Sequence, residues 1–318
     1  MADHLSKWYG KVVGINDFSV EIGPGVTGLL GPNGAGKSTF IKLLVGALRP
    51  SKGKLEVLGE RVWGNRRVLG RIGYCPEHDG IYDDLTGAEF VAAMGRLGGM
   101  SADEAARRGL ETLEQLGLAK AAGRLLREYS KGMRQRAKLA QALVHDPELL
   151  LFDEPLTGCD PLARVQITKM IKALGGAGKT VIVSSHILHE IESMTDEIVL
   201  LYKGQVLAEG NIYQIREMID NHPHQIRIEC DRPRELGQRL VASEDVRAIE
   251  FPGEEALVLE TANPDGCYPL IPRLALEQGI KIRALTSPDN NLQAVFEYLT
   301  RDRGPEGVAP RDAQGRRS

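Results

Sequence analysis

The sequence predicts an α/β protein with a buried parallel sheet, a helical insertion and a small α+β domain at its end. Three observations support this fold class. Four short apolar runs, at 26–31, 71–76, 149–154 and 180–185, lack polar alternation, as strands covered on both faces do. Residues 86–145 read as mostly helical and fall between two of these strands. After about residue 222, short strands and helices alternate in a different order.

Length and composition set the class of protein. The 318 residues can form one large domain and a smaller one. The hydrophobic content of 42% and charged content of 26% are typical of soluble globular proteins. A net charge of -3 gives no polycationic signature of nucleic-acid binding. We find no apolar run long enough for a membrane span and no signal peptide, so we expect a cytoplasmic protein.

The cysteines support the same location. The chain has four, without the CxxC or CxxH spacing of a metal site: Cys75, Cys159, Cys230 and Cys267. We expect free thiols in a reducing compartment.

The helical insertion has two start signals. Thr86 with Glu89, and Ser101 with Glu104, both fit the S/T-x-x-E capping box that begins helices. We therefore predict a helical subdomain at about 86–145, inserted within a first domain of residues 1–221.

The remaining chain predicts a second domain at 222–302. We expect strands at 224–230, 246–251, 255–261 and 280–287, and helices at 232–242, 267–279 and 291–301. This β-α-β-β-α-β order with a closing helix suggests a ferredoxin-like domain. The tail at 303–318 is rich in Pro, Gly and charge, which predicts disorder.

The stretch "GLLGPNGAGKSTF" at 28–40 contains the pattern G-x-x-x-x-G-K-[ST] between a predicted strand and a predicted helix at 38–48. Glycines let successive backbone amides curl around a phosphate, and the helix N-terminus adds positive potential. Lys37 can reach the β- and γ-phosphates, and the Ser38 hydroxyl can ligate Mg²⁺. The alternative, a Gly-rich turn with a solvated lysine, is disfavoured by the flanking strand and helix. The predicted phosphate-binding loop comprises Gly31, Pro32, Asn33, Gly34, Ala35, Gly36, Lys37, Ser38 and Thr39.

Two adjacent acids end the apolar run "LLLFDEP" at 149–155. Buried acids are costly unless something neutralises them. Beside a phosphate-binding loop, Asp153 would hold the Mg²⁺ complex, and Glu154 would orient and polarise the attacking water. The alternative is an ordinary helix cap.

The segment "YSKGMRQRAKLAQAL" at 129–143 resembles the signature motif of ABC ATPases, commonly LSGGQ followed by a basic helix. Four residues fit variants of that pattern: Ser130, Gly132, Arg134 and Gln135. Three depart from its commonest form: Tyr129, Lys131 and Met133. Without the other motifs, the segment would read as a helix start with a solvated basic face.

The resemblance covers roughly residues 4–215 and assigns further residues. In "WYGKVVGINDFS", Tyr9 matches the aromatic that stacks on adenine, although it could be an ordinary packing residue. "GYCPEHDGIYDDLT" is similar to the loop that joins the family's two subdomains, where Glu77 replaces the usual Gln near nucleotide and metal. This change brings a charge and removes an amide donor.

Two short motifs complete the resemblance. "LTGCDP" matches the family's D-loop, with Asp160 as its acid. "VIVSSH" places His186 where the family's switch histidine touches the γ-phosphate, although a strand-end histidine is often structural.

The resemblance implies an ATP-binding and hydrolysing subunit that drives export through a separate transmembrane permease, at the inner face of the cell membrane. It implies a dimer in which Ser130 and Gly132 of one chain face the ATP held by the other, and it implies no nucleic-acid partner. The residues implied to be catalytic are Glu154, His186 and Lys37, and those implied to bind Mg²⁺ are Ser38, Asp153 and Glu77. "PDNNLQAVFEYLT" at 288–300 resembles the end of bacterial exporter ATPases, or is simply an amphipathic helix that packs on its own sheet.

Two other functions stay open. ABC ATPases that act on ribosomes or nucleic acid usually have two fused nucleotide domains, long coiled coils or iron–sulfur cysteines, and this chain has none. A non-hydrolysing regulatory clamp is disfavoured by Glu154 and His186.

Overall fold

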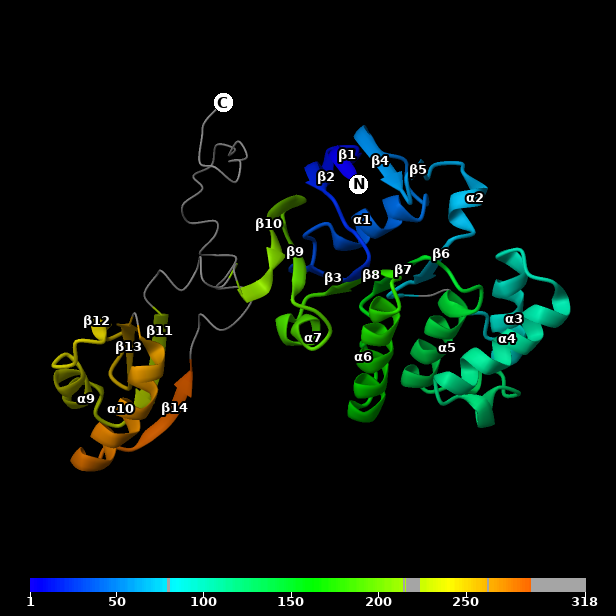
Figure 1. Ribbon diagram of the computed structural model, residues 1–318. Coiled ribbons are helices and arrows are strands. Elements are labelled where there is room, and N and C mark those ends of the chain that lie inside the picture. The colour runs from blue at the N-terminus through cyan, green and yellow to red at the C-terminus, as the bar shows by residue number, and fades with distance from the viewer. Residues whose placement is uncertain (79–80, 214, 216–223, 262, 287–318) are drawn as a thin grey trace. The chain divides into compact units, whose positions relative to one another are not determined.

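The computed structural model describes residues 1–78, 81–213, 215, 224–261 and 263–286 and is drawn in Figure 1. The chain divides into two compact units, Met1–Ile212 and Tyr213–Ser318. Three predictions fall outside the described residues: the domain boundary at 221/222, the closing helix at 291–301 and the tail at 303–318.

The first unit contains a six-stranded sheet with the order β10-β9-β3-β8-β7-β6. Its strands are β3 (Gly25–Leu30), β6 (Ile72–Cys75), β7 (Leu149–Asp153), β8 (Thr180–Ser185), β9 (Glu197–Tyr202) and β10 (Gln205–Asn211). All neighbours are parallel except β10, which runs antiparallel to β9. The four predicted strands are β3, β6, β7 and β8, which confirms the reading of unalternated apolar runs as strands of a parallel sheet.

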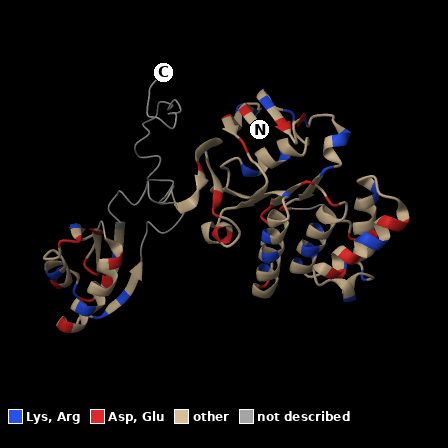
Figure 2. Cartoon of the chain, viewed as in Figure 1, with Lys and Arg blue, Asp and Glu red and all other residues tan. Residues whose placement is uncertain are grey.

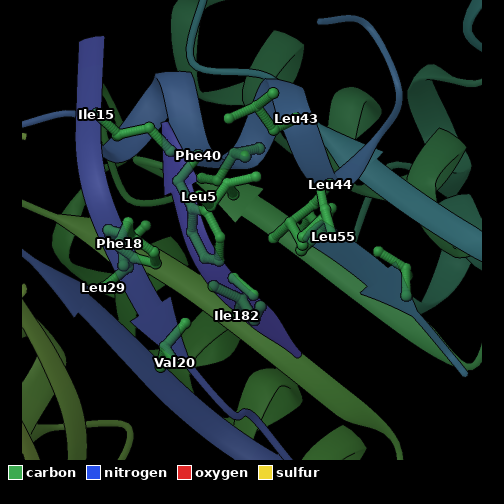
Figure 3. Packing of buried hydrophobic residues seen from close by; sticks show 14 of the residues in the cluster. Leu5, Ile15, Phe18, Val20, Leu29, Phe40, Leu43, Leu44, Leu55 and Ile182 are labelled. Atoms are coloured by element: carbon green, nitrogen blue, oxygen red, sulfur yellow. The ribbon is translucent and has the colours of Figure 1, made fainter. Parts of the chain in front are cut away.

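Helices lie on both faces of this sheet. In Figure 1, α1 (Lys37–Leu44) lies on one face, and α6 (Pro161–Gly176) and α7 (Leu188–Glu192) lie on the other. Figure 3 shows side chains of α1 meeting those of β3, β8 and a second sheet in one apolar core. Phe18 and Phe40 are fully buried there, with ring centroids 4.4 Å apart. This packing fixes α1, and therefore the loop before it, on the sheet.

The second sheet of this unit is antiparallel and was not predicted. Its order is β2-β1-β4-β5, formed by β1 (Ala2–Tyr9), β2 (Val12–Val20), β4 (Lys52–Val57) and β5 (Glu60–Arg61), and the short helix α2 (Arg66–Leu69) follows. His4 and Asp17 have positive φ angles of 46° and 51°, and the β1–β2 register shifts between paired positions. Such irregularities interrupt the alternation of apolar and polar residues from which strands are read.

The helical subdomain consists of α3 (Gly87–Leu97), α4 (Ala102–Gln115) and α5 (Lys131–Leu143), with short 3₁₀ turns at Ala119–Ala121 and Leu126–Glu128. Thr86 and Glu89 form the predicted capping box in full. Ser101 accepts a hydrogen bond from the Glu104 amide at 3.3 Å and so caps α4. The prediction of a mostly helical insertion is confirmed.

The second unit follows the predicted order of strands and helices as far as residue 286. It contains β11 (His224–Cys230), α9 (Pro233–Leu240), β12 (Val246–Glu250), β13 (Ala256–Thr261), α10 (Pro264–Gln278) and β14 (Ile282–Thr286). Its strands form an antiparallel sheet with the order β12-β13-β11-β14. A separate core of Ile226, Ile228 and Leu257 with Leu236 and Ile271 joins this sheet to the two helices. Figure 2 shows acidic and basic residues mixed along the elements of each unit.

Candidate functional site

The carboxyl ends of four neighbouring strands bring the predicted site residues to one edge of the parallel sheet. Leu30 of β3 pairs with Ser185 of β8, and Ser184 of β8 pairs with Asp153 of β7. Cys75 at the end of β6 pairs with Phe152 of β7. The segments that follow these strands, which carry the phosphate-binding loop, Glu154, His186 and Glu77, therefore start side by side. Ligands of open α/β sheets bind at this edge.

The phosphate-binding loop has a conformation that only glycine allows at two of its positions. Gly34 and Gly36 have φ angles of 81° and 109°, a region that side chains disfavour. A Cβ atom on Gly36 would also lie 2.7 Å from the Gly14 carbonyl oxygen. Lys37 begins α1, and its Nζ donates to the Gly31 carbonyl oxygen at 2.7 Å. The loop is thus wrapped around a buried ammonium group next to a helix N-terminus, where an anion is stabilised.

The two acids at the end of β7 are both buried, and Ser184 forms a hydrogen bond with each of these residues. The Ser184 hydroxyl donates to Asp153 Oδ1 at 2.5 Å and accepts from the Glu154 backbone amide at 3.0 Å. Glu154 has a φ of 50°, so the chain turns sharply between the acids. Ser184 was not predicted as a site residue from the sequence. The sequence could have indicated it, because two serines end the otherwise apolar strand β8, and a buried hydroxyl needs a polar partner.

The Glu154 carboxylate lies between two nitrogen atoms. His186 Nδ1 is 3.0 Å from Glu154 Oε1, and Lys37 Nζ is 3.8 Å from the same oxygen. Burial raises the pKa of Glu154, while the hydrogen bond from His186 and the charge of Lys37 oppose that rise. Burial lowers the pKa of Lys37, and the charge of Glu154 opposes that fall. A carboxylate with a raised pKa beside an anion-binding loop is suited to take up or orient a proton of water.

A cleft with a volume of about 320 Å³ joins most of the predicted residues. It is lined by Tyr9, Val12, Val13, Gly14, Pro32, Asn33, Gly34, Ala35, Gly36, Lys37, Ser38, Thr39, Glu77 and Glu154. Tyr9 is 44% exposed, and a Cβ atom on Gly14 would lie 2.8 Å from its Cε2. Three lining residues were not predicted from the sequence, and the β1–β2 turn brings them to the loop: Val12, Val13 and Gly14.

Six predicted residues do not line this cleft. Gly31, Asp153 and His186 still contact residues of its lining or their neighbours, through Lys37, Ser184 and Glu154. The other three lie apart from it. Ser130 is the N-cap of α5 and accepts from the Met133 amide at 3.2 Å. Asp160 is the N-cap of α6 and accepts from the Ala163 amide at 2.9 Å. Gly132 lies close to Gly158, since a Cβ atom on Gly132 would be 3.3 Å from its carbonyl oxygen. Within one chain, these residues start helices and do not touch the cleft.

The residues present fit a hard divalent cation. Ser38 and Glu77 line the cleft, and Asp153 is held by Ser184 at its edge. All three supply oxygen atoms, the ligands that Mg²⁺ prefers. Across the described residues, no group of three or more His, Cys, Asp or Glu side chains could hold a metal ion. Mg²⁺ in nucleotide sites is usually bound by one or two protein carboxylates together with substrate phosphates and waters.

In the part of the chain that the structure describes, no helix has the length and apolarity needed to cross a membrane.

Comparisons with known proteins agree with the α/β fold described above. The family described as ABC transporter matches residues 15–157. A structure titled "Structure of ATP binding subunit of ABC transporter" is 30% identical, with a TM-score of 0.64, over 69% of this chain and 92% of that one. A dimeric ATP-binding cassette in a post-hydrolysis state with ADP and phosphate is 24% identical, with a TM-score of 0.61, over 66% of this chain and 97% of that one, and shows the fold.

Curated relatives extend the match beyond the first unit. Nod factor export ATP-binding protein I of Rhizobium johnstonii is 36% identical over 298 residues, 93% of either chain. The daunorubicin/doxorubicin resistance ATP-binding protein DrrA of Streptomyces peucetius is 36% identical over 242 residues, 76% of this chain and 73% of that protein. An uncharacterized ABC transporter ATP-binding protein of Synechocystis is 42% identical over 208 residues, 64% of this chain, and the match spans 58% of that protein's length. This chain therefore belongs to the family of ABC transporter ATP-binding proteins.

Proposed function

We propose that this chain binds and hydrolyses ATP and thereby drives the export of a substrate through a separate membrane protein. The observation that carries the proposal is the cleft in which Tyr9, the phosphate-binding loop, Glu77 and Glu154 lie together. An aromatic face for a base, amides for phosphates and a buried carboxylate for water are the parts that hydrolysis of a nucleotide needs.

Each residue has a distinct part in the reaction. Tyr9 stacks on the adenine, and the phosphate-binding loop holds the β- and γ-phosphates with Lys37. Glu154 orients the attacking water, and the hydrogen bond from His186 holds the carboxylate in place. Mg²⁺, held by Ser38 and Asp153 with Glu77 near it, would neutralise negative charge on the phosphates. Positioning and charge neutralisation account for most of the catalysis of phosphoryl transfer.

Two copies of the chain form the working unit. Ser130 and Gly132 of one copy face the γ-phosphate bound by the other copy, and Asp160 lies at the contact between them. Two features support this arrangement. The N-terminus of the 13-residue helix α5 is a suitable site for an anion. Its N-cap, Ser130, is exposed within one chain.

The membrane partner is a permease, which places this chain at the cytoplasmic face of the membrane. The name of the Nod factor relative, which states export, supports the direction of transport, and the drug-resistance name of DrrA is consistent with it. We expect the permease to dock on the loop after Glu77 and on the helical subdomain. Tyr82, Leu97 and Leu110 support this surface, because these large apolar side chains are exposed there.

The division into domains at 1–221 and 222–302 is part of the proposal, with a ferredoxin-like second domain. The strand order β12-β13-β11-β14, all antiparallel, with α9 between β11 and β12 and α10 between β13 and β14, supports this topology. Its role would be to tune dimerisation or docking.

Glu154→Gln tests the proposed reaction. We expect turnover to fall by about 10²–10⁴-fold, as the loss of a general base does. ATP binding and the fold should persist, and the variant should accumulate as an ATP-bound dimer. Steady-state hydrolysis, nucleotide titration and gel filtration with ATP measure the three quantities. Near-normal hydrolysis by this variant would contradict the proposal.

A further inference from the structure

Helix α5 carries a row of polar side chains that donate to main-chain carbonyl groups near the cleft. Gln135 Nε2 donates to the Pro155 carbonyl oxygen at 3.0 Å. Three residues on, Lys138 Nζ donates to the carbonyl oxygens of Pro76 and Glu77 at 2.8 and 2.6 Å. Gln141 Nε2 donates to the Tyr74 carbonyl oxygen at 2.5 Å. Since residues three apart share one helix face, the row forms a single polar edge along α5.

Lys138 differs from the other members of this row because it brings a charge into the interior. Lys138 is only 6% exposed, and its neighbours in the chain, Ala137 and Leu139, are buried. Placing an ammonium group among buried residues is costly unless oriented acceptors surround it. Hydrogen bonds from a charged donor are also shorter and stronger than neutral ones. The two carbonyl groups are therefore held firmly, and an apolar residue at this position would leave both without this donor.

The carbonyl groups that Lys138 binds belong to the residues that present Glu77. Glu77 lines the cleft with Glu154, so its backbone position decides where its carboxylate lies. Gln135 binds Pro155, the residue directly after Glu154. One helix therefore holds the main chain beside both acids of the cleft. Ser130, in the segment that resembles the signature motif, is the N-cap of the same helix.

We propose that Lys138 is a positioning residue that holds Glu77 in the cleft and makes its position depend on helix α5. The proposal rests on the ATPase function proposed above and adds to it a physical link between the signature helix and the attack site. Movement of α5 on dimer formation would pass through Lys138 to Glu77 and through Gln135 to Glu154.

The test compares Lys138→Met, which keeps the length of the side chain without its charge, with Lys138→Arg, which keeps the charge and its donors. Lys169→Met, on an exposed position of α6, is the control for loss of a lysine. Purified full-length variants are assayed for ATP hydrolysis with Mg²⁺, and for amide hydrogen exchange in the peptide 72–78. Thermal unfolding checks that each variant is folded.

We expect Lys138→Met to lower kcat by about tenfold, as the loss of a charged buried hydrogen bond would, while KM for ATP changes less than about twofold. Exchange at 72–78 should become faster, and Lys138→Arg should restore most of kcat. Combined with Glu77→Gln, Lys138→Met should add little to the loss, because both changes act on one group. Lys169→Met should behave as the unchanged protein.

Several outcomes would overturn the proposal: an unchanged kcat, a rise in KM alone, additive losses in the double variant, or unchanged exchange at 72–78. If Lys138→Met does not fold, Lys138→Gln takes its place, with a smaller loss of kcat expected because it keeps one donor. If the unaltered protein does not hydrolyse ATP, the proposed function fails instead, and the exchange at 72–78 still tests the contact.

Discussion

Two regions contribute to the same proposed reaction but are built in different ways. One is the strand edge, where Asp153 and Glu154 lie at the end of β7, and the other is the signature turn at the start of α5, around Ser130. At the strand edge, Asp153 and Glu154 are buried, and partners from β8 and the phosphate-binding loop hold them. At the signature turn, Ser130 is exposed, and its hydroxyl binds only the first turn of its own helix among the contacts that the structure describes. Asp160 likewise caps its own helix.

This difference indicates how much of the site a single chain can assemble. Charged groups are buried at the strand edge because neighbouring elements of the same chain satisfy them. N-cap residues at the signature turn satisfy their own helices and leave the helix end open to a further anion. We therefore expect one chain to hold a nucleotide, whereas the proposed closure over it requires a second copy.

The largest expected effect comes from separating the two regions in a mixed dimer. One chain carries Lys37→Ala and the other Ser130→Arg, both with Glu154→Gln so that bound ATP is not consumed. In the proposed dimer, one nucleotide site then lies between the loop with Lys37→Ala and the signature segment with Ser130→Arg. The other site lies between a loop and a signature segment that carry neither of these two substitutions. We expect one trapped nucleotide per mixed dimer and none in either homodimer, measured by nucleotide content after gel filtration. Trapping that follows each chain's own Ser130 would show that the signature acts within its chain.

Ser184→Ala tests how strongly the strand edge is preassembled. Its hydroxyl serves both Asp153 and the Glu154 amide, so its loss leaves two buried groups without this partner. We expect kcat to fall by at least about tenfold and the free energy of unfolding to fall by about 1–3 kcal/mol. Chemical denaturation and single-turnover hydrolysis measure the two effects. Ser193→Ala is the control, because that hydroxyl donates to the Glu190 carbonyl oxygen at the end of α7. Equal effects from both variants would contradict a special role for Ser184.

Tyr9→Ala tests the exposed end of the cleft. Removal of a base-stacking aromatic should weaken ATP binding by about 1–3 kcal/mol, with a smaller effect on turnover at saturating ATP. Trp8→Ala is a matched control, because Trp8 is similarly exposed and does not line the cleft. Nucleotide titrations should show the loss only for Tyr9→Ala, and an unchanged affinity would make Tyr9 a packing residue.

The smallest effect expected is a shift in the pH dependence of hydrolysis. Glu154 must be ionised to orient water, and burial raises its pKa. Activity should therefore fall with decreasing pH at a higher pH than for an ordinary glutamate. The hydrogen bond from His186 lowers this pKa, so His186→Ala should move the acidic limb further upward. The pH profile of kcat measures the shift, and a downward movement would be inconsistent with the assigned contact.

The sequence by itself determined the parallel sheet, the glycine-rich loop before α1 and the two acids at the end of β7. These features depend on local patterns: unalternated apolar runs, glycines where φ is positive, and a lysine at a helix start. The capping box of Thr86 and Glu89 was also readable, because its hydrogen bonds join residues three apart. The succession of elements in the second unit followed from the same kind of local signal.

Only the tertiary structure decided which distant residues support these features. Ser184 reaches Asp153 from a strand 31 positions away, and Lys138 reaches Glu77 from a helix 61 positions away. The antiparallel sheet was hidden because positive φ angles at His4 and Asp17 interrupt its alternation. Such contacts are created when strands and helices pack, and a serine or lysine in the sequence does not indicate which carbonyl or carboxylate will lie beside it.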